Sequence, residues 1–384
     1  MDQSIRLFSV RGIAVRMHLT FPLILVWAAL QFGVLARGGM SGAVFGVLTT
    51  MLLFVIVVLH ELGHSVAAQY YGVEVKQIVL LPLGGVAQLA RIPEKPSQEF
   101  VIAIAGPAVN FGLALIFGVV AALAGWSTEI SRLPALLGDM SRISLAGLFA
   151  YTFASNLLLG VFNLIPAFPM DGGRILRAAL AARLPYPRAT ELAAGIGQAL
   201  AWVMGIAGFL RGDFFWVLIA LFVHSGATQE RQLVSARSIL SGLTVEQAFS
   251  RGARALAPDQ PLKDAIDLTL NSFQSDFPIC DGDSLIGMLT HARLIKALNE
   301  RGPDARAGDV MERTVIALNP SDELIEAQQR LAEAKLDALP VIQGDRFLGI
   351  LTTRDISEIY RLASIRQDLL RRRQPSSSEV QTQM

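Results

Sequence analysis

The pattern HELGH, from His60 to His64, has the residue types and spacing of a chemical site. Side chains four residues apart lie on one face of a helix, so the two imidazoles can bind a single metal ion. The Glu61 carboxylate then lies beside the metal, where it can take a proton from water. The pattern HExxH fixes only three positions, so when it stands alone a histidine pair in a purely structural helix is an equally good interpretation.

The hydropathy of the chain favours the functional interpretation, because it indicates a membrane. Apolar residues make up 52% of the chain and charged residues 17%, and the mean hydropathy is +0.47. The run from Gly42 to Leu59 is almost entirely apolar and leads directly into the pattern. Two histidines and a glutamate at the end of such a run are costly unless they line a water-filled cavity inside the protein.

Six apolar segments predict a polytopic α-helical membrane protein with about six transmembrane helices. Roughly 20 residues are needed to cross a hydrocarbon core of ~30 Å. The arm before the first segment and the loops after the second and fourth carry ten Lys and Arg residues, and the three opposite loops carry four. The positive-inside rule therefore places both termini in the cytoplasm. The expected location is the plasma (inner) membrane. The segments lie near residues 20–36, 42–68, 98–124, 143–165, 189–209 and 213–226.

A catalytic zinc site needs a third protein ligand and one open position. His18 and His224 lie at the ends of apolar segments and His291 lies in the polar C-terminal part, so an acidic residue is the better candidate. Asp171 follows the fourth segment in NLIPAFPMDGG, where prolines end the helix and paired glycines permit a tight turn. The second and fourth segments run in the same direction, so Asp171 reaches the depth of His60. Taken alone, Asp171 could equally cap the helix that follows it.

HELGH and NLIPAFPMDGG together resemble the motifs of the site-2 protease family of intramembrane zinc metalloproteases. The resemblance covers the chain from about residue 10 to residue 230. It implies one zinc ion per chain, bound by His60, His64 and Asp171, with Glu61 as the general base.

The same resemblance identifies candidate substrate-binding residues. Asn163, eight residues before the aspartate, is implied to hold substrate or to stabilise the oxyanion, for which its amide is a suitable donor. The segment from Ile78 to Leu89 is apolar and interrupted by Gly84 and Gly85, which predicts a hairpin or a buried strand pair. The resemblance implies a re-entrant hairpin whose edge accepts an extended substrate. The alternative is a loop that only packs against the metal-site helix.

The polar C-terminal part contains an internal repeat. The segment from Phe277 aligns without a gap on the segment from Leu339, at an offset of 62 residues. Each copy has the pattern helix, apolar strand, Gly-Asp turn, strand and helix, which resembles an α/β tandem pair of cystathionine-β-synthase-type (CBS) domains. We therefore expect a transmembrane zinc protease domain, a first and a second CBS domain, and a disordered tail, over residues 1–230, 239–303, 304–369 and 370–384 respectively.

The CBS resemblance implies an adenosine nucleotide (ATP, ADP or AMP) bound between the copies. In the second copy Thr352 matches the threonine of the family pattern and Asp355 its ribose-binding aspartate. In the first copy Arg293 replaces the aspartate, so at most one competent nucleotide site is expected. A purely structural role, in which the pair forms a homodimer, is the alternative.

The predicted function is an intramembrane zinc endopeptidase that cuts transmembrane segments of membrane-tethered proteins, the chemistry of regulated intramembrane proteolysis. The resemblance implies substrates such as a tethered transcription regulator or an anti-sigma factor. One alternative is a catalytically silent membrane scaffold that senses nucleotide, and another is a zinc protease of soluble or lipidated peptides. A net charge of +1 without a basic aromatic patch predicts no nucleic-acid partner. The single cysteine, Cys280, excludes an internal disulfide framework and a cysteine-based zinc site.

Overall fold

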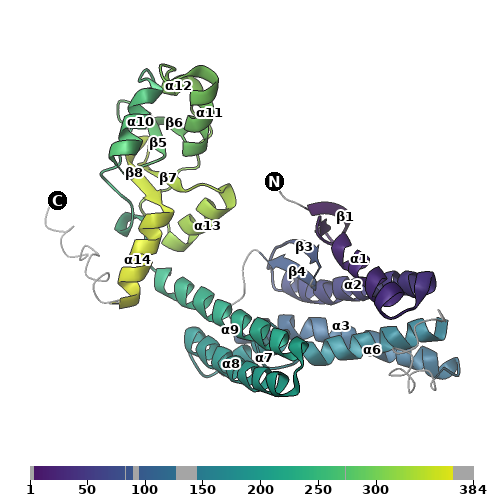
Figure 1. Ribbon diagram of the computed structural model, residues 1–384. Helices are drawn as coiled ribbons and strands as arrows, with labels where there is room; N and C mark the ends of the chain where they lie inside the picture. The colour runs from purple at the N-terminus through teal and green to yellow at the C-terminus, as the bar shows by residue number, and fades with distance from the viewer. Residues whose placement is uncertain (1–3, 83, 90–94, 127–144, 273, 366–384) are drawn as a thin grey trace. The chain divides into compact units, whose positions relative to one another are not determined.

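The computed structural model describes the chain except residues 1–3, 83, 90–94, 127–144, 273 and 366–384 (Figure 1). The chain divides into two compact units, residues 1–232 and 233–384, which are described separately. The predicted disordered tail, 370–384, lies outside the described residues.

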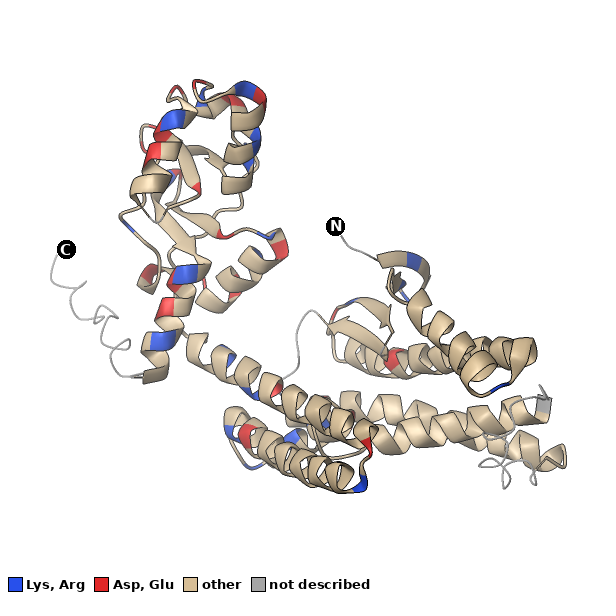
Figure 2. Cartoon of the chain, viewed as in Figure 1, with Lys and Arg blue, Asp and Glu red and all other residues tan. Residues whose placement is uncertain are grey.

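The N-terminal unit is built mainly from long apolar helices. Four of the helices in the described part are long and apolar enough to cross a membrane, namely Gly39–Tyr70, Pro96–Leu123, Ala146–Asn163 and Tyr186–Arg211, while Pro22–Leu35 is shorter. The membrane character predicted from composition is thus confirmed, and the count of about six spans stays a prediction. Figure 2 shows α3 and α6 almost without charged residues. The helices are α1 (Pro22–Leu30), the π-helical turn η1 (Gln31–Leu35), α2 (Gly39–Tyr70), α3 (Pro96–Leu123), α6 (Leu145–Asn163), α7 (Asp171–Ala181), α8 (Tyr186–Arg211) and α9 (Phe214–Leu240).

Small residues bring α2 and α3 into close contact beside the HELGH pattern. A Cβ atom added to Gly63 would lie 2.8 Å from the Ala105 carbonyl oxygen and 2.9 Å from Val109 Cγ2. In lipid there is no hydrophobic driving force between helices, so close packing of this kind holds apolar helices together. Gly63, the fourth residue of the motif, therefore sets the distance between the two helices.

A four-stranded sheet accompanies these helices, in the order β1-β2-β3-β4. The N-terminal residues, expected to form only a short basic arm, make a strand pair that joins it. Ile13 and Val15 alternate with more exposed neighbours and are fully buried. The strand pair predicted within residues 78–89 is present, and its placement as a re-entrant hairpin stays a prediction. The strands are β1 (Ser4–Val10), β2 (Ile13–His18), β3 (Val75–Leu81) and β4 (Gly84–Leu89), with β2 and β3 parallel and the other pairs antiparallel.

The C-terminal unit contains the repeat that the sequence predicts, with one helix-strand-strand-helix motif per copy. Each copy has its own hydrophobic core, and the four strands form one sheet in the order β5-β6-β8-β7. The elements are the 3-10 turn η2 (Val245–Gln247), α10 (Leu262–Asn271), β5 (Phe277–Asp281), β6 (Ser284–Leu289), α11 (His291–Arg301), α12 (Ala307–Val310), α13 (Leu324–Ala334), β7 (Ala338–Gln343), β8 (Arg346–Thr352) and α14 (Thr353–Ile365).

Candidate metal centre

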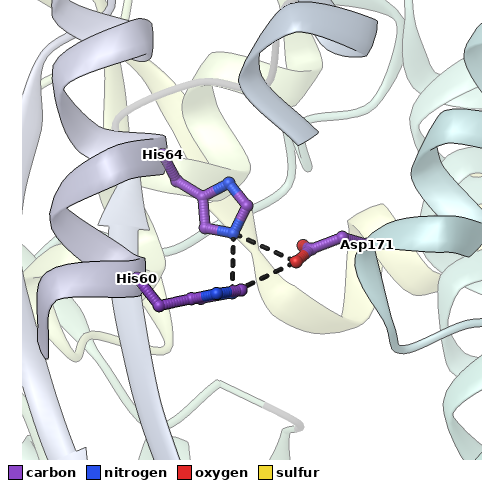
Figure 3. A group of neighbouring side chains, drawn as sticks. All are labelled: His60, His64 and Asp171. Carbon is purple, nitrogen blue, oxygen red and sulfur yellow. Dashed lines mark hydrogen bonds and ion pairs between the residues drawn. The ribbon is translucent and has the colours of Figure 1, made fainter. Parts of the chain in front are cut away.

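Three potential metal ligands meet between α2 and the start of α7 (Figure 3). The Nε2 atoms of His60 and His64 are 3.1 Å apart. Asp171 Oδ2 lies 3.2 Å from His60 Nε2 and 3.1 Å from His64 Nε2. All three residues are buried. Within the described part of the chain, this is the group of His, Cys, Asp and Glu side chains arranged to hold a metal ion.

The donor set and its spacing fit zinc. Zn–N and Zn–O bonds of ~2.0–2.1 Å in a tetrahedron place neighbouring ligand atoms about 3.3 Å apart. The three observed separations are 3.1 to 3.2 Å. Two imidazole nitrogens and a carboxylate oxygen face one point. A proton between two of these atoms leaves the third without a partner, whereas one cation can bind all three. Three protein ligands also leave the fourth position open, as a catalytic zinc site requires.

The second nitrogen of His64 is held by the backbone of α3. Its Nδ1–H donates to the Ile102 carbonyl oxygen at 2.7 Å. That hydrogen bond fixes the tautomer in which Nε2 carries the lone pair that a metal needs. Ile102 supplies only a backbone carbonyl, so no side-chain signal in the sequence could have identified it.

Gly106 lies directly against both imidazoles and was missed by the sequence reasoning. A Cβ atom at this position would lie 2.3 Å from His64 Nε2 and 2.7 Å from His60 Cε1. Any side chain there would therefore displace the ligands. The segment AGPAVN, with its glycine in an otherwise helical apolar run, was the only available signal.

Asp171 reaches the histidines because the chain folds tightly just before α7. Met170 is the N-cap residue of α7, and the Asp171 side chain makes contacts with the histidines and no capping bond in the described structure. The capping alternative for Asp171 is therefore wrong. The following glycines do not supply a left-handed turn, since neither has a positive φ. They permit close approach instead: a Cβ at Gly172 would lie 2.2 Å from the Ile165 carbonyl oxygen.

The Glu61 carboxylate faces strand β4. Its Oε2 accepts a hydrogen bond from the Ala87 backbone N–H at 3.1 Å. A Cβ at Gly85 would lie 3.0 Å from Glu61 Cγ, so the glycine lets the strand approach the helix. Gly84, at the first position of β4, has φ +145°, and a Cβ added there would meet nothing within 4 Å. The structure thus brings Gly85 to the candidate base and places Gly84 next to it.

The remaining sequence candidates in the N-terminal unit are not among the three residues of this cluster. Asn163 is the last residue of α6 and is half-buried. His18 Nδ1 lies 2.8 Å from Thr20 Oγ1, and the His224 ring packs edge-on against Trp202 with centroids 5.9 Å apart.

The candidate nucleotide residues of the C-terminal unit are engaged with protein groups. The Thr352 hydroxyl and backbone N–H both donate to Asp355 Oδ2, at 2.6 and 2.9 Å, and the Asp355 N–H donates to Thr352 Oγ1 at 3.0 Å. This reciprocal arrangement caps α14. Ser250 Oγ donates to Asp355 Oδ1 at 2.9 Å. In the first copy Arg293, at the corresponding position, bonds the Val310 carbonyl oxygen and Glu312 Oε1 instead.

Comparison with known proteins agrees with both halves of this description. The sequence pattern of Peptidase family M50 matches residues 48–133 and 127–204, and the CBS domain pattern matches residues 245–300 and 307–361.

Two individual proteins extend the comparison. Zinc metalloprotease MJ0392 of Methanocaldococcus jannaschii is 33% identical over 369 residues, which cover 96% of this chain and 99% of that protein. The solved structure of the site-2 protease from the same organism is 41% identical, covers 59% of this chain and 95% of that chain, and superposes with a TM-score of 0.44. Similarity over nearly the full length of a zinc metalloprotease, together with the two family patterns, shows that this chain belongs to peptidase family M50, the site-2 protease family of zinc metalloendopeptidases, and carries a tandem pair of CBS domains.

Proposed function

We propose that the protein hydrolyses peptide bonds within transmembrane segments of other membrane proteins, at a zinc site formed by His60, His64 and Asp171. The observation that carries this proposal is the convergence of three candidate ligand atoms within 3.2 Å of one another. They lie on helices of a chain whose described part has four helices long and apolar enough to cross a membrane. Ionisable groups at such positions mark functional sites, because burying them for packing alone is costly.

Zinc bound at this site lowers the pKa of water and polarises a carbonyl group. The chain's own residues carry out the proton transfers. The Glu61 carboxylate accepts a proton as the water oxygen bonds to the carbonyl carbon, and it returns that proton to the amide nitrogen as the C–N bond breaks. The Asn163 amide is the proposed donor to the negative charge that develops on the carbonyl oxygen.

Strand β4 is the proposed docking edge for substrate. A transmembrane helix hides its carbonyl groups in internal hydrogen bonds, so the substrate must be extended before it can be cut. Among the described strands β4 lies at the edge of its sheet, which can pair with an extended peptide through backbone groups. The Ala87 N–H contact to Glu61 supports this role, because a peptide paired with β4 would lie close to the base. Gly84, where a Cβ would meet nothing within 4 Å, would leave room for its side chains, and Gly85 would let β4 lie close to Glu61.

Loop charges support an orientation in which both termini face the cytoplasm from the plasma membrane. The substrate would then be a membrane-spanning protein cut near its cytoplasmic end. A tethered transcription regulator or an anti-sigma factor fits that description. The CBS pair would adjust the cutting rate by binding an adenosine nucleotide at Thr352 and Asp355, and would also support a homodimer.

The test of the enzymatic proposal is Glu61→Gln in the purified full-length protein. The amide cannot accept a proton, so cleavage of a reporter with one transmembrane segment should fall by at least about a hundredfold. Zinc content should stay at one ion per chain. Glu74→Gln, at an exposed position just after α2, is the matched control and should cut at the wild-type rate.

Two results would overturn the proposal. If Glu61→Gln cleaves the reporter at the wild-type rate, Glu61 is not the base. If the folded wild-type protein lacks stoichiometric zinc, the catalytically silent scaffold is favoured. Comparing the membrane proteomes of cells that carry the wild type or Glu61→Gln would identify the substrate. Truncated single-span proteins should accumulate with Glu61→Gln. Accumulation of lipidated peptides instead would favour the alternative protease class.

A further inference from the structure

Arg177 is completely buried on α7, six residues after Asp171, and it contacts three other elements. Its Nε donates to Glu99 Oε1 at 2.8 Å, and its Nη2 donates to the same oxygen. Its Nη1 donates to Glu230 Oε1 at 2.6 Å. The guanidinium also stacks on the rings of Phe168 and Tyr186, with centroids at 4.9 and 5.0 Å. One side chain therefore ties α7 to α3, to α8 and to α9.

The partners of Arg177 lead directly to the metal centre. Glu99 is on α3, one turn before Ile102, whose carbonyl oxygen accepts from His64 Nδ1. Further along the same helix, Gly106 touches both imidazoles. Phe168 lies in the tightly folded segment just before Asp171, the first residue of α7. Arg177 thus connects the helix that carries the carboxylate ligand with the helix that positions the histidine ligands.

Stability alone does not account for this cluster. Replacing a buried ion pair with well-packed apolar residues is often neutral or stabilising, so an apolar contact would hold these helices at least as well. Moreover, Glu99 Oε2 is buried without a hydrogen-bond partner in the described part of the chain, which carries a further cost. What a guanidinium adds is a rigid, planar set of donors that fixes the relative position of its partners.

We propose that Arg177, with Glu99 and Glu230, is the positioning device of the metal centre, and that it sets the zinc affinity by fixing Asp171 relative to His60 and His64. The inference rests on the proposed zinc site. It assigns no chemical step to Arg177, which acts only through the helices that it joins.

The experiment measures zinc affinity of purified full-length variants by competition with a chromophoric chelator, together with the thermal midpoint of each metal-free form. Arg177→Lys keeps the charge but loses the planar donors. It should bind zinc at least about tenfold more weakly, the size of effect seen when groups that orient metal ligands are removed. Arg183→Met removes an exposed arginine just after α7 and is the control. Its zinc affinity should equal that of the wild type.

The decisive variant replaces the whole cluster, with Arg177→Met, Glu99→Met and Glu230→Met together. This apolar variant should have a thermal midpoint equal to that of the wild type, but its zinc affinity should stay below the wild-type value. Two results would show that the cluster is only structural: wild-type zinc affinity in the triple variant, or wild-type zinc affinity in Arg177→Lys. Either result would overturn this inference but leave the proposed zinc site intact. Absence of stoichiometric zinc from the wild type would overturn the zinc site and this inference together.

Discussion

At Gly106, helix α3 comes into contact with both imidazoles of the metal centre. Gly106→Ala would place a methyl group 2.3 Å from the present position of His64 Nε2. The histidines must move to avoid it, and zinc should no longer bind stoichiometrically. Metal analysis of the purified variant measures this. Gly112→Ala on the same helix is the control, because a Cβ there meets nothing within 4 Å. Full zinc content in Gly106→Ala would show that the rings can shift without losing the metal.

Asp171 would supply the charged ligand atom of the proposed zinc site. Asp171→Asn keeps the shape of the side chain but replaces the carboxylate with a neutral amide, which is a poor zinc ligand. We expect zinc affinity to fall by at least about tenfold, and turnover to be lost with it. Chelator competition and cleavage of the reporter measure the two effects. Zinc affinity unchanged from the wild type would mean that Asp171 is not a ligand.

Cys280 lies on β5 and is buried. Burial, with a smaller contribution from the charge of Asp283, raises the pKa of its thiol from 9.0 to about 11. The reactive form is the thiolate, so the native protein should resist iodoacetamide at neutral pH and react faster only as the pH rises toward that value. Mass spectrometry of the alkylated protein measures this, with urea-unfolded protein as the control. Equal labelling of native and unfolded protein at pH 8 would contradict it.

At the scale of elements, the contact between β4 and α2 links substrate docking to the proton acceptor. Ala87→Pro removes the N–H that donates to Glu61, and proline is tolerated in an edge strand where its position faces away from the neighbouring strand. With Glu61 free to reorient, turnover should fall by at least about tenfold, while zinc content stays at one per chain. Ala87→Ser keeps the N–H and should cut like the wild type. Equal cleavage rates for Ala87→Pro and Ala87→Ser would show that the hydrogen bond from β4 to Glu61 does not affect catalysis.

Local patterns in the sequence predicted the helices and singled out the three candidate ligands that the structure brings together, but contacts between distant segments were not predictable. His60 and His64 lie on one helical face by spacing alone, and Asp171 follows from the chain direction after a proline-broken helix. Strand β2 was missed because it pairs with β3 across the intervening α1 and α2. Gly106 and Ile102 act through backbone position, which depends on which helices meet. Arg177 was counted as a cytoplasmic loop charge, and its burial with two glutamates weakens its contribution to that orientation argument.

At the scale of the whole molecule, α9 joins the two units, since it begins in the apolar part at Phe214 and ends at Leu240 in the core of the second CBS copy. Only a ligand with different affinities for two arrangements of the CBS pair can change the cutting rate. We expect one adenosine nucleotide per chain and a shifted cleavage rate. A ribose hydroxyl would share Asp355 Oδ1 with Ser250. Asp355→Ala should therefore abolish both binding and the rate shift.

Calorimetry on the full-length protein measures nucleotide binding, and the reporter measures the rate. Glu358→Ala, an exposed acidic position on the same helix, is the control. Should ATP, ADP and AMP all fail to bind at millimolar concentration, the reciprocal capping of α14 by Thr352 and Asp355 would be a sufficient structural reason for both residues. The CBS pair would then be a module for dimerisation.

The parallel pairing of β2 with β3 has a consequence for biosynthesis. Residues 13–18 leave the ribosome before α1 and α2, yet their partner strand is made only after both helices. Strand β2 therefore stays unpaired on one side until α1, α2 and β3 have been made. Strand β3 continues into β4, whose Ala87 N–H contacts Glu61, so we expect the sheet beside the candidate site to be complete only after β2 has paired with β3. A bulky fusion at the N-terminus would consequently delay maturation of the enzyme, whereas the same fusion at the C-terminus would not.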